Sequence, residues 1–261
     1  MKVKQIAELM EKYTPARLAY AWDNVGLLVG NGENEVKKIM ITLDTNLETV
    51  REAAENGCDM ILSHHPIMFR GIKRLDLISP TGKMMEILIK NDISVFAAHT
   101  NMDTAKIGIN AYLAELFGLE NIKILEQHTD DIEAGLGRYG DLKNEITLDE
   151  LCKITKEKLN TPFVRAAGAS EKKIKTLCVA SGSCSECIET AIKCGCDAVI
   201  TGDMKYHEMI DYSECGIAVI DAGHYPTEII VTDIFEKILE ELGNDKPQII
   251  KSTERDIFRI Y

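Results

Sequence analysis

The 261-residue sequence is long enough to bury one large core or two smaller ones. Its composition, 45% hydrophobic and 28% charged, is typical of a water-soluble globular protein. No apolar run approaches the roughly 20 residues that a membrane-spanning helix needs, which argues against an integral membrane protein. A net charge of −12 argues against broad nucleic-acid binding, which requires a basic surface. A small anionic substrate remains compatible with this charge, because bound metal ions can supply positive charge locally.

The first residues, Met1–Gln5, lead directly into an amphipathic pattern and contain no signal-peptide core. We therefore expect a cytoplasmic protein. In that compartment its eight cysteines are expected to be reduced thiols rather than a disulfide framework.

Hydrophobic periodicity predicts strands that alternate with helices, which is typical of an α/β sheet with functional loops after the strands. In the first half, helices are expected over 3–13, from about 46 to 57, from 80 to about 91, and from about 107 to 118. Strands are expected over 27–29, 39–43, 60–63 and 93–98. Ser79 and Pro80 are typical of an N-cap followed by a first helical residue.

The periodic pattern weakens between 119 and 145, where we expect the boundary between two halves, 1–124 and 125–261. Thr147 and Glu150 form a capping-box sequence that predicts the start of the next helix. Strands are then expected over 174–180, 198–201 and 217–220, and helices over 184–194 and after Gly223. The C-terminal helix could pack back on the first half. The tail after Pro247 could add one edge strand.

A short internal similarity suggests that the two halves are related. Gly57-Cys58-Asp59 and Gly195-Cys196-Asp197 each precede an apolar strand. The strands 93–98 and 217–222 also resemble one another. We interpret these matches as an internal repeat of two similar α/β domains, with coincidence between two helix–turn–strand units as the alternative.

Five residues that follow predicted strands could bind metal: His64, His65, Asp103, His224 and Glu228. The carboxyl ends of parallel strands are the usual ligand-binding edge of such a sheet. His224 and Glu228 are four residues apart, so they share a helix face if the helix begins early enough. Three imidazoles and two carboxylates suit zinc, iron or manganese better than calcium or magnesium.

Several segments in the same order resemble the Nif-three-like family, whose members are named GTP cyclohydrolase I type 2 homologues. They are Asp23–Leu27, Leu62–Pro66, His99–Asp103, Gly202–Asp203 and Gly223–Glu228. The resemblance covers nearly the whole chain. It implies two similar α/β domains, a dinuclear metal site in the cleft between them, and a ring-shaped homohexamer.

Transferred residue by residue, the resemblance implies that His65 and Asp103 hold one divalent ion and His64 and His224 hold the other. Glu228 would bridge the two ions. Two departures are evident: the chain is too short for the inserted domain of many members, and Asp203 stands where many have glutamate.

His99 and His207 are candidates for catalytic roles, His99 by orienting Asp103 or acting on substrate and His207 as a general acid or base. For each, a structural or surface histidine is the alternative. Arg138, Lys73 and Lys205 could contact phosphates, although solvated charge is the commoner role.

Cys184 and Cys187 form a C-x-x-C motif at a predicted helix start, where thiolates are stabilised, so a redox role is a rival reading. The thioredoxin-like context expected of such a motif is absent. Cys58 and Cys196 are expected to be packing residues.

The sequence therefore predicts a dinuclear metal-dependent hydrolase that acts on a nucleotide-like substrate, with GTP cyclohydrolase chemistry as one option. Its first half would carry His64, His65 and Asp103, and its second half His224 and Glu228. The alternative is a non-enzymatic hexameric metal-binding scaffold or interaction factor. An enzyme would need open metal positions beside a substrate-sized cleft, and a scaffold would not.

Overall fold

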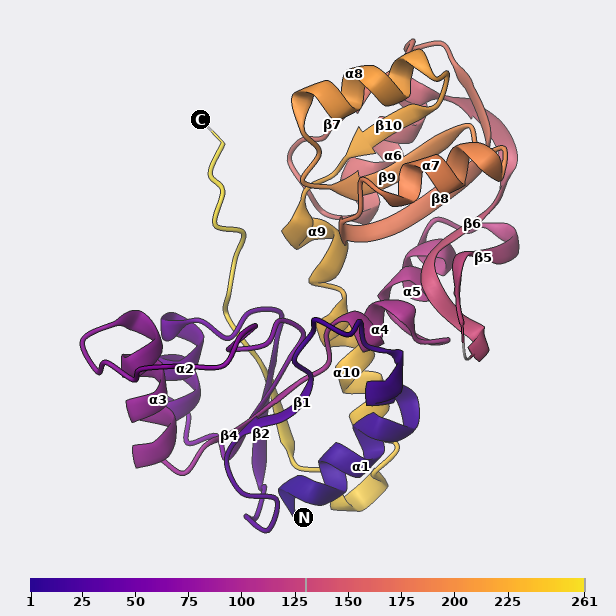
Figure 1. Ribbon diagram of the computed structural model, residues 1–261. Coiled ribbons are helices and arrows are strands. Elements are labelled where there is room, and N and C mark those ends of the chain that lie inside the picture. Colours follow the sequence, from indigo (N-terminus) through magenta and orange to yellow (C-terminus); the bar gives the residue numbers. More distant parts are fainter. Residues whose placement is uncertain (130, 261) are drawn as a thin grey trace. The chain divides into compact units, whose positions relative to one another are not determined.

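The computed structural model describes residues 1–129 and 131–260, which form two compact units of mixed α/β structure (Figure 1). Unit 1 is built from Met1–Met102 and from the chain from Val231 onward, and unit 2 from Asp103–Ile230. These bounds differ from the expected halves, 1–124 and 125–261. The chain leaves the first unit earlier than expected and returns to it for its last segment.

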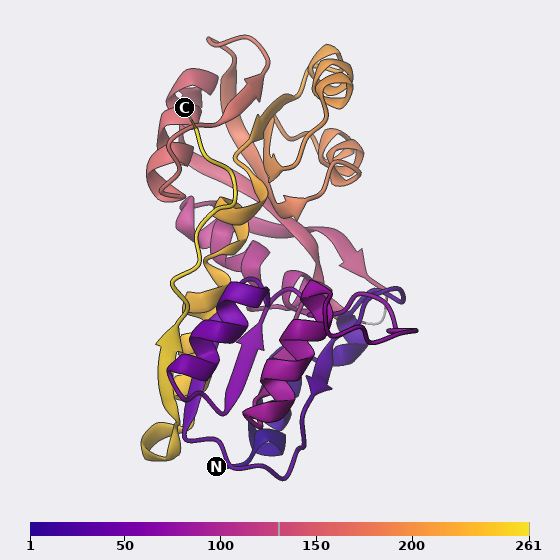
Figure 2. The same ribbon diagram turned by 90° about the vertical axis from the view of Figure 1, so that its left-hand side faces the viewer.

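The sheet of unit 1 has five strands in the order β1-β4-β3-β2-β11. Only β1 is antiparallel to its neighbour β4; the other pairings are parallel. β11 lies at the edge beside β2, so the strand expected after Pro247 is present (Figure 2). The bounds are β1 Gly26–Val29, β2 Lys38–Thr42, β3 Met60–Ser63, β4 Ser94–Ala97 and β11 Gln248–Lys251.

Helices cover both faces of this sheet, with α2 and α3 on one face and α1 and α10 on the other (Figure 1). The α2–α3 face buries Met40, Ile61 and Val95 of the strands against Val50 and Leu88 of the helices. Buried apolar side chains on both faces explain why the central strands read as continuous hydrophobic runs. The bounds are α1 Val3–Tyr13, η1 Ala16–Leu18, α2 Leu47–Glu55, α3 Pro80–Lys90, α10 Val231–Glu240 and η2 Gly243–Asp245.

The predicted helix starts of unit 1 are confirmed by their caps. The Asn46 side chain accepts hydrogen bonds from the backbone N–H groups of Glu48 and Thr49 at the start of α2. The Ser79 side chain accepts from Gly82 N, and Pro80 is the first residue of α3. A side-chain acceptor satisfies N–H groups that have no partner within the helix, which fixes where each helix begins.

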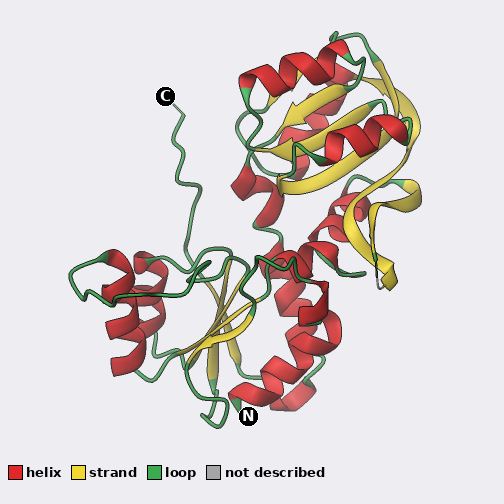
Figure 3. Cartoon of the chain, viewed as in Figure 1, coloured by secondary structure: helices red, strands yellow, loops and turns green. Residues whose placement is uncertain are grey.

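The sheet of unit 2 has six strands in the order β5-β6-β8-β9-β10-β7 (Figure 3). β8, β9 and β10 are parallel, whereas β5, β6 and β7 each pair antiparallel with a neighbour. The bounds are β5 Glu120–His128, β6 Asp131–Thr147, β7 Arg165–Ala167, β8 Lys173–Ser183, β9 Ala198–Gly202 and β10 Ala218–Asp221.

The core of unit 2 packs strands β8, β9 and β10 against α7 and α8. Cys178, Val199 and Val219 of the strands are buried with Ile188 of α7, and Tyr212 of α8 packs against them. The capping box at the start of α6 is present as predicted, with Thr147 and Glu150 bonded to each other's backbone. The bounds are α5 Ile109–Leu116, α6 Leu148–Lys158, α7 Cys187–Lys193, α8 Tyr206–Glu214 and α9 His224–Glu228; α4, Thr100–Thr104, lies where the chain passes from unit 1 to unit 2.

The segment with the weak sequence pattern forms two antiparallel neighbours of this sheet, β5 and β6, rather than a linker. Its glycines allow the two strands to approach closely. A Cβ atom at Gly135 would lie 2.2 Å from Glu126 O, and one at Gly140 would lie 2.5 Å from Glu120 O. Glycines that look like turn formers in the sequence are here required by close packing within a sheet.

One turn occurs in the same form in both units. The Asp59 carboxylate accepts two backbone N–H groups at the start of β2, at 2.8 and 2.9 Å. The Asp197 carboxylate likewise accepts two backbone N–H groups at the start of β8, both at 2.9 Å. Gly57 and Gly195 precede these turns with φ values of +63° and +76°. The wider internal repeat stays a prediction.

Within the described residues, every helix is too short or too polar to cross a membrane.

Candidate metal centre

Two adjacent histidines follow strand β3 in unit 1. His64 is fully buried, and its Nδ1 lies 2.8 Å from the carbonyl oxygen of Ala98. His65 is partly buried, and its Nδ1 lies 2.9 Å from Asp44 Oδ1. The backbone N–H groups of His64 and His65 donate to the carbonyl oxygens of Thr42 and Leu43, respectively, at the end of the adjacent strand β2. The end of β3 therefore holds both imidazoles in defined orientations.

A third histidine follows strand β4 in the same unit. His99 Nδ1 lies 2.9 Å from Asp23 Oδ1, and the other oxygen of Asp23 accepts from Thr100 N and Thr100 Oγ1. Burial alone would raise the pKa of Asp23, but the hydrogen bonds from His99 and Thr100 outweigh it and hold that pKa well below its usual range. Asp23 is thus a fixed carboxylate that orients His99.

The three imidazoles form one cluster. Each of His64, His65 and His99 has a possible ligand atom within 4.8 Å of those of the other two. A carbonyl or carboxylate oxygen can only accept a hydrogen bond, so each Nδ1 carries the hydrogen in the neutral ring. The lone pair then lies on Nε2, which is the atom that can bind a metal. A carboxylate or carbonyl partner on the other ring nitrogen is the usual support of a metal-binding histidine.

Unit 2 contains a histidine with the same kind of support. His224 Nδ1 lies 2.7 Å from Asp203 Oδ2, and His224 Nε2 lies 2.8 Å from Glu228 Oε2. Helix α9 begins at His224, so the spacing of four places both side chains on one helix face, as the sequence suggested. Asp203 itself has φ +56°, a left-handed conformation that aspartate adopts more readily than most residues.

Glu228 is buried because strand β8 passes directly beneath it. Gly182 N donates to Thr227 Oγ1 at 3.0 Å, and a Cβ atom at Gly182 would lie 2.0 Å from Glu228 Oε1. Gly182 also has φ +59°. Both the backbone conformation and the available space require glycine at this position, because the Glu228 carboxylate occupies the place where a Cβ atom would lie.

Asp103, the other acidic candidate, is also buried in unit 2. Ser181 Oγ donates to Asp103 Oδ1 at 3.3 Å, and Asn110 Nδ2 donates to the Asp103 carbonyl at 3.1 Å. Asn110 Oδ1 in turn accepts from Ser181 N at 2.8 Å. The end of β8 therefore contacts both candidate carboxylate ligands of unit 2. Ser181 donates a hydrogen bond to Asp103, and Gly182 leaves space for Glu228.

These donors fit a metal ion. Imidazole nitrogens supported by carboxylates, together with buried carboxylate oxygens, are typical ligands of first-row transition metals. The sequence identified the histidines but missed their supports, Asp23, Asp44 and Asp203. For Asp203 the available signal was its position, since it comes directly after β9.

The second-tier candidates lie in different surroundings. His207 is exposed on the first turn of α8, where its ring contacts Tyr206, and its proposed role in proton transfer stays a prediction. Lys73 and Lys205 are exposed. Arg138 is buried and donates to the carbonyls of Gly135, Gly137 and Ala105, so its guanidinium supports the fold of unit 2. Burial lowers the pKa of Arg138 to about 10.

Cys184 and Cys187 are joined by a disulfide, so the expectation of reduced thiols is wrong for this pair. Both residues are buried at the junction of β8 and α7. Cys58 and Cys196 are buried free thiols, as their predicted packing role requires.

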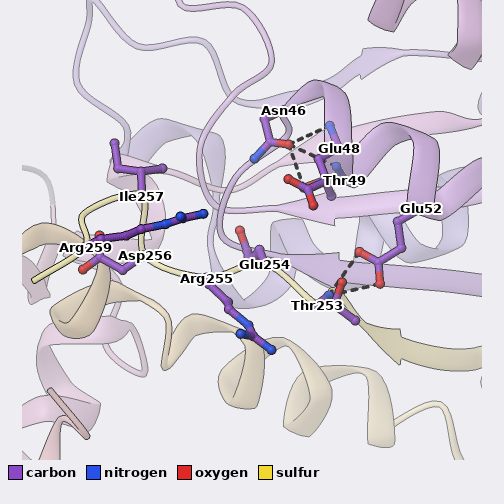
Figure 4. A pocket seen from close by; sticks show the side chains of 10 residues that line it. All are labelled: Asn46, Glu48, Thr49, Glu52, Thr253, Glu254, Arg255, Asp256, Ile257 and Arg259. Carbon is purple, nitrogen blue, oxygen red and sulfur yellow. Dashed lines mark hydrogen bonds between the residues drawn. The ribbon is translucent and has the colours of Figure 1, made fainter. Parts of the chain in front are cut away.

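A pocket of about 490 Å³ lies in unit 1 between the start of α2 and the C-terminal segment (Figure 4). Its lining includes Glu52, which accepts from Thr253 N, and Glu254. The Glu254 carboxylate accepts from Leu43 N at 2.6 Å and Asp44 N at 3.0 Å. The C-terminal segment thus fixes the backbone of Asp44, the residue that orients His65.

The model of the Duf34/NIF3 (NGG1p interacting factor 3) family matches residues 1–256 of the chain. The chain belongs to the Duf34/NIF3 family. Among curated Duf34/NIF3 relatives, a "GTP cyclohydrolase 1 type 2 homolog" of Clostridium acetobutylicum is 37% identical and covers 99% of this chain and 98% of its own. The alignment with a Bacillus subtilis relative, 26% identical, extends over 348 residues, in keeping with an insertion that this shorter chain lacks.

Solved Duf34/NIF3 structures share the fold. "Reduced HcgD" of Methanocaldococcus jannaschii matches with a TM-score of 0.81 at 35% identity, covering 96% of this chain and 97% of its own. A Staphylococcus aureus protein matches with a TM-score of 0.92 at 29% identity, covering 100% of this chain and 99% of its own. The predicted family and the mixed α/β fold are therefore confirmed.

Proposed function

We propose that this Duf34/NIF3 protein is a metal-dependent hydrolase that binds two divalent ions and acts on a nucleotide-like substrate. One observation supports metal binding most strongly. His64, His65, His99 and His224 all direct Nδ1 to a carbonyl or carboxylate oxygen. An oxygen acceptor at Nδ1, which leaves Nε2 to face a ligand, is the pattern that metal-binding histidines show.

The assignment of ligands follows the family resemblance. On that basis His65 and Asp103 would hold one ion, His64 and His224 would hold the other, and Glu228 would serve both. Zinc, iron and manganese suit these nitrogen and oxygen donors. When bound, such a pair activates water and polarises the substrate atom that the water attacks.

The residues of the chain prepare this chemistry in three ways. Asp44 and Asp203 orient the rings of His65 and His224 through their Nδ1 atoms. Burial keeps Glu228 and Asp103 out of bulk water, which strengthens their interaction with a cation. In this proposal His99, oriented by Asp23, contacts substrate, and His207 is the general acid or base.

The name of the Clostridium relatives directs the first choice of substrate to GTP. The test is metal analysis of the purified protein, followed by a hydrolysis screen of GTP and other nucleotides with added zinc, iron or manganese. Turnover that depends on metal and is lost in His64→Ala supports the proposal. Stoichiometric metal with no turnover of any nucleotide would contradict the hydrolase and favour the metal-binding scaffold.

We further propose that the protein is a cytoplasmic homohexamer, as the family resemblance implies. Light scattering at micromolar concentration tests the assembly. A mass of six chains supports it, and a stable monomer of 29.1 kDa would contradict it.

A further inference from the structure

Three exposed aromatic rings gather beside the histidine cluster of unit 1. Trp22, Phe69 and Tyr20 are 62%, 49% and 39% exposed, respectively. Trp22 and Phe69 each meet the His99 ring edge-on, with centroid distances of 6.0 and 5.5 Å, and Tyr20 stacks on Trp22 at 6.0 Å. A contiguous set of exposed aromatic side chains at such a place is typical of a binding surface.

The surrounding backbone holds these rings in place. Tyr20 N donates to Thr100 Oγ1 at 3.0 Å, and Asp23 N donates to the Tyr20 carbonyl at 2.9 Å. Asn24 Nδ2 donates to the Met68 carbonyl at 2.7 Å, which ties the Trp22 loop to the Phe69 loop. The rings are therefore exposed although both loops are anchored. A ligand that stacks on them would lose little binding free energy to the ordering of these loops.

His99 connects the aromatic rings to the metal-binding histidines. Its ring lies 5.1 Å from the His64 ring and 5.4 Å from the His65 ring, between centroids. A planar group stacked on Trp22 or Phe69 is thus separated from these two imidazoles by the breadth of one ring. The loop that contains Phe69 also carries three exposed cationic side chains, Arg70, Lys73 and Arg74.

We propose that Trp22 and Phe69 form the stacking subsite for the heteroaromatic ring of the substrate, and that the cationic loop after Phe69 receives its anionic group. This inference rests on the proposed function and names the part of the substrate that the chain recognises. Stacking on an aromatic side chain tolerates any base, because every base has a π-face. The subsite therefore selects a planar nitrogen heterocycle with a phosphate rather than one particular base.

The test uses the intrinsic fluorescence of Trp22, which is the sole tryptophan of the chain. The metal-loaded protein is titrated with GTP, guanosine and ribose 5-phosphate. Saturable quenching by GTP and guanosine, with none by ribose 5-phosphate, supports the subsite. No quenching by GTP at millimolar concentration would overturn it.

Variants give a second readout by calorimetry, which does not depend on tryptophan. Trp22→Ala is expected to weaken GTP binding roughly 5- to 150-fold, the range for one lost base–aromatic stack, and Trp22→Phe to restore most of it. Phe163→Ala, at a 43% exposed aromatic residue of unit 2, is the matched control and should bind GTP normally. Unchanged GTP affinity in Trp22→Ala would overturn the subsite.

Metal content separates this inference from the proposed function. Trp22→Ala should retain as much metal as the wild type, because the indole supplies no ligand. A wild-type protein that binds no metal contradicts the proposed function through metal analysis alone. A protein that binds metal and hydrolyses GTP with the same KM in Trp22→Ala contradicts only the stacking subsite.

Discussion

Gly182→Ala is expected to release metal from the protein while leaving it folded. The added Cβ would lie 2.0 Å from Glu228 Oε1 and 2.9 Å from its Cδ. Ordinary van der Waals contact requires the carboxylate to retreat by about 1.4 Å. Metal–oxygen bonds tolerate deviations of only about 0.2 Å, so this displacement removes Glu228 as a ligand.

The expected loss of metal affinity is at least the roughly 10- to 100-fold that follows disruption of a supporting residue. The positive φ of position 182 adds a cost of about 1–2 kcal/mol in the free energy of unfolding, because alanine disfavours the left-handed region. Competition with a chelator measures the first effect, and urea unfolding measures the second.

Gly195→Ala is the matched control in the same unit. Gly195 has φ +76°, but no atom lies within 4 Å of its added Cβ. Gly195→Ala should therefore carry only the conformational cost of the positive φ, and only Gly182→Ala should lose metal. Normal metal affinity in Gly182→Ala, measured beside this control, would refute the placement of Glu228 as a ligand.

Three further predictions test the supports and the proton-transfer group. Asp203→Asn should weaken metal binding by roughly 10- to 100-fold, because the amide no longer fixes the tautomer of His224; chelator competition measures this. Asp23 has a lowered pKa, so its stabilising effect is present above the ordinary carboxyl pKa of 3.8 and is lost as the pH falls through its folded pKa. The stability difference between wild type and Asp23→Asn, from urea unfolding, should hence be present above the ordinary carboxyl pKa and shrink in stronger acid; a difference that grows in acid would contradict this. His207→Gln should lower turnover with unchanged metal content if His207 is the general acid, and normal turnover would remove that role.

Local signals explain the parts of the fold that the sequence could predict. Asn46, Ser79 and Thr147 cap their helices through their own side chains, so the information lies within four residues of each helix start. The buried parallel strands were recognisable as short apolar runs that end in polar residues.

Other features depend on contacts that are remote in the sequence. Strands β5 and β6 were missed because Gly135 and Gly140 serve close strand approach, which a turn-former pattern does not reveal. The helix expected after Gly223 is divided into α9 and α10. Residues 103–124 were expected in the first half but lie in unit 2, where Ser181 of β8 bonds to both Asp103 and Asn110.

The same distinction applies to the metal centre. The histidines and Glu228 were predicted as ligands from residue type, spacing and resemblance, and this role stays a prediction. The roles of Asp44 and Gly182 could not be predicted, because they depend on where His65 and Glu228 lie in space. Glu254 is the extreme case: it fixes the Asp44 backbone from 210 residues further along the chain.

Metal stoichiometry tests the central claim most directly. Mass spectrometry of the metal in purified wild-type protein should give about two divalent ions per chain, as a dinuclear site requires. Glu228→Gln should retain less metal than any single histidine variant, because a bridging ligand serves both ions, whereas the exposed-residue control Glu240→Gln should match the wild type. Full retention of both ions in Glu228→Gln would contradict the bridging role, and a wild-type chain that binds no metal would contradict the account as a whole.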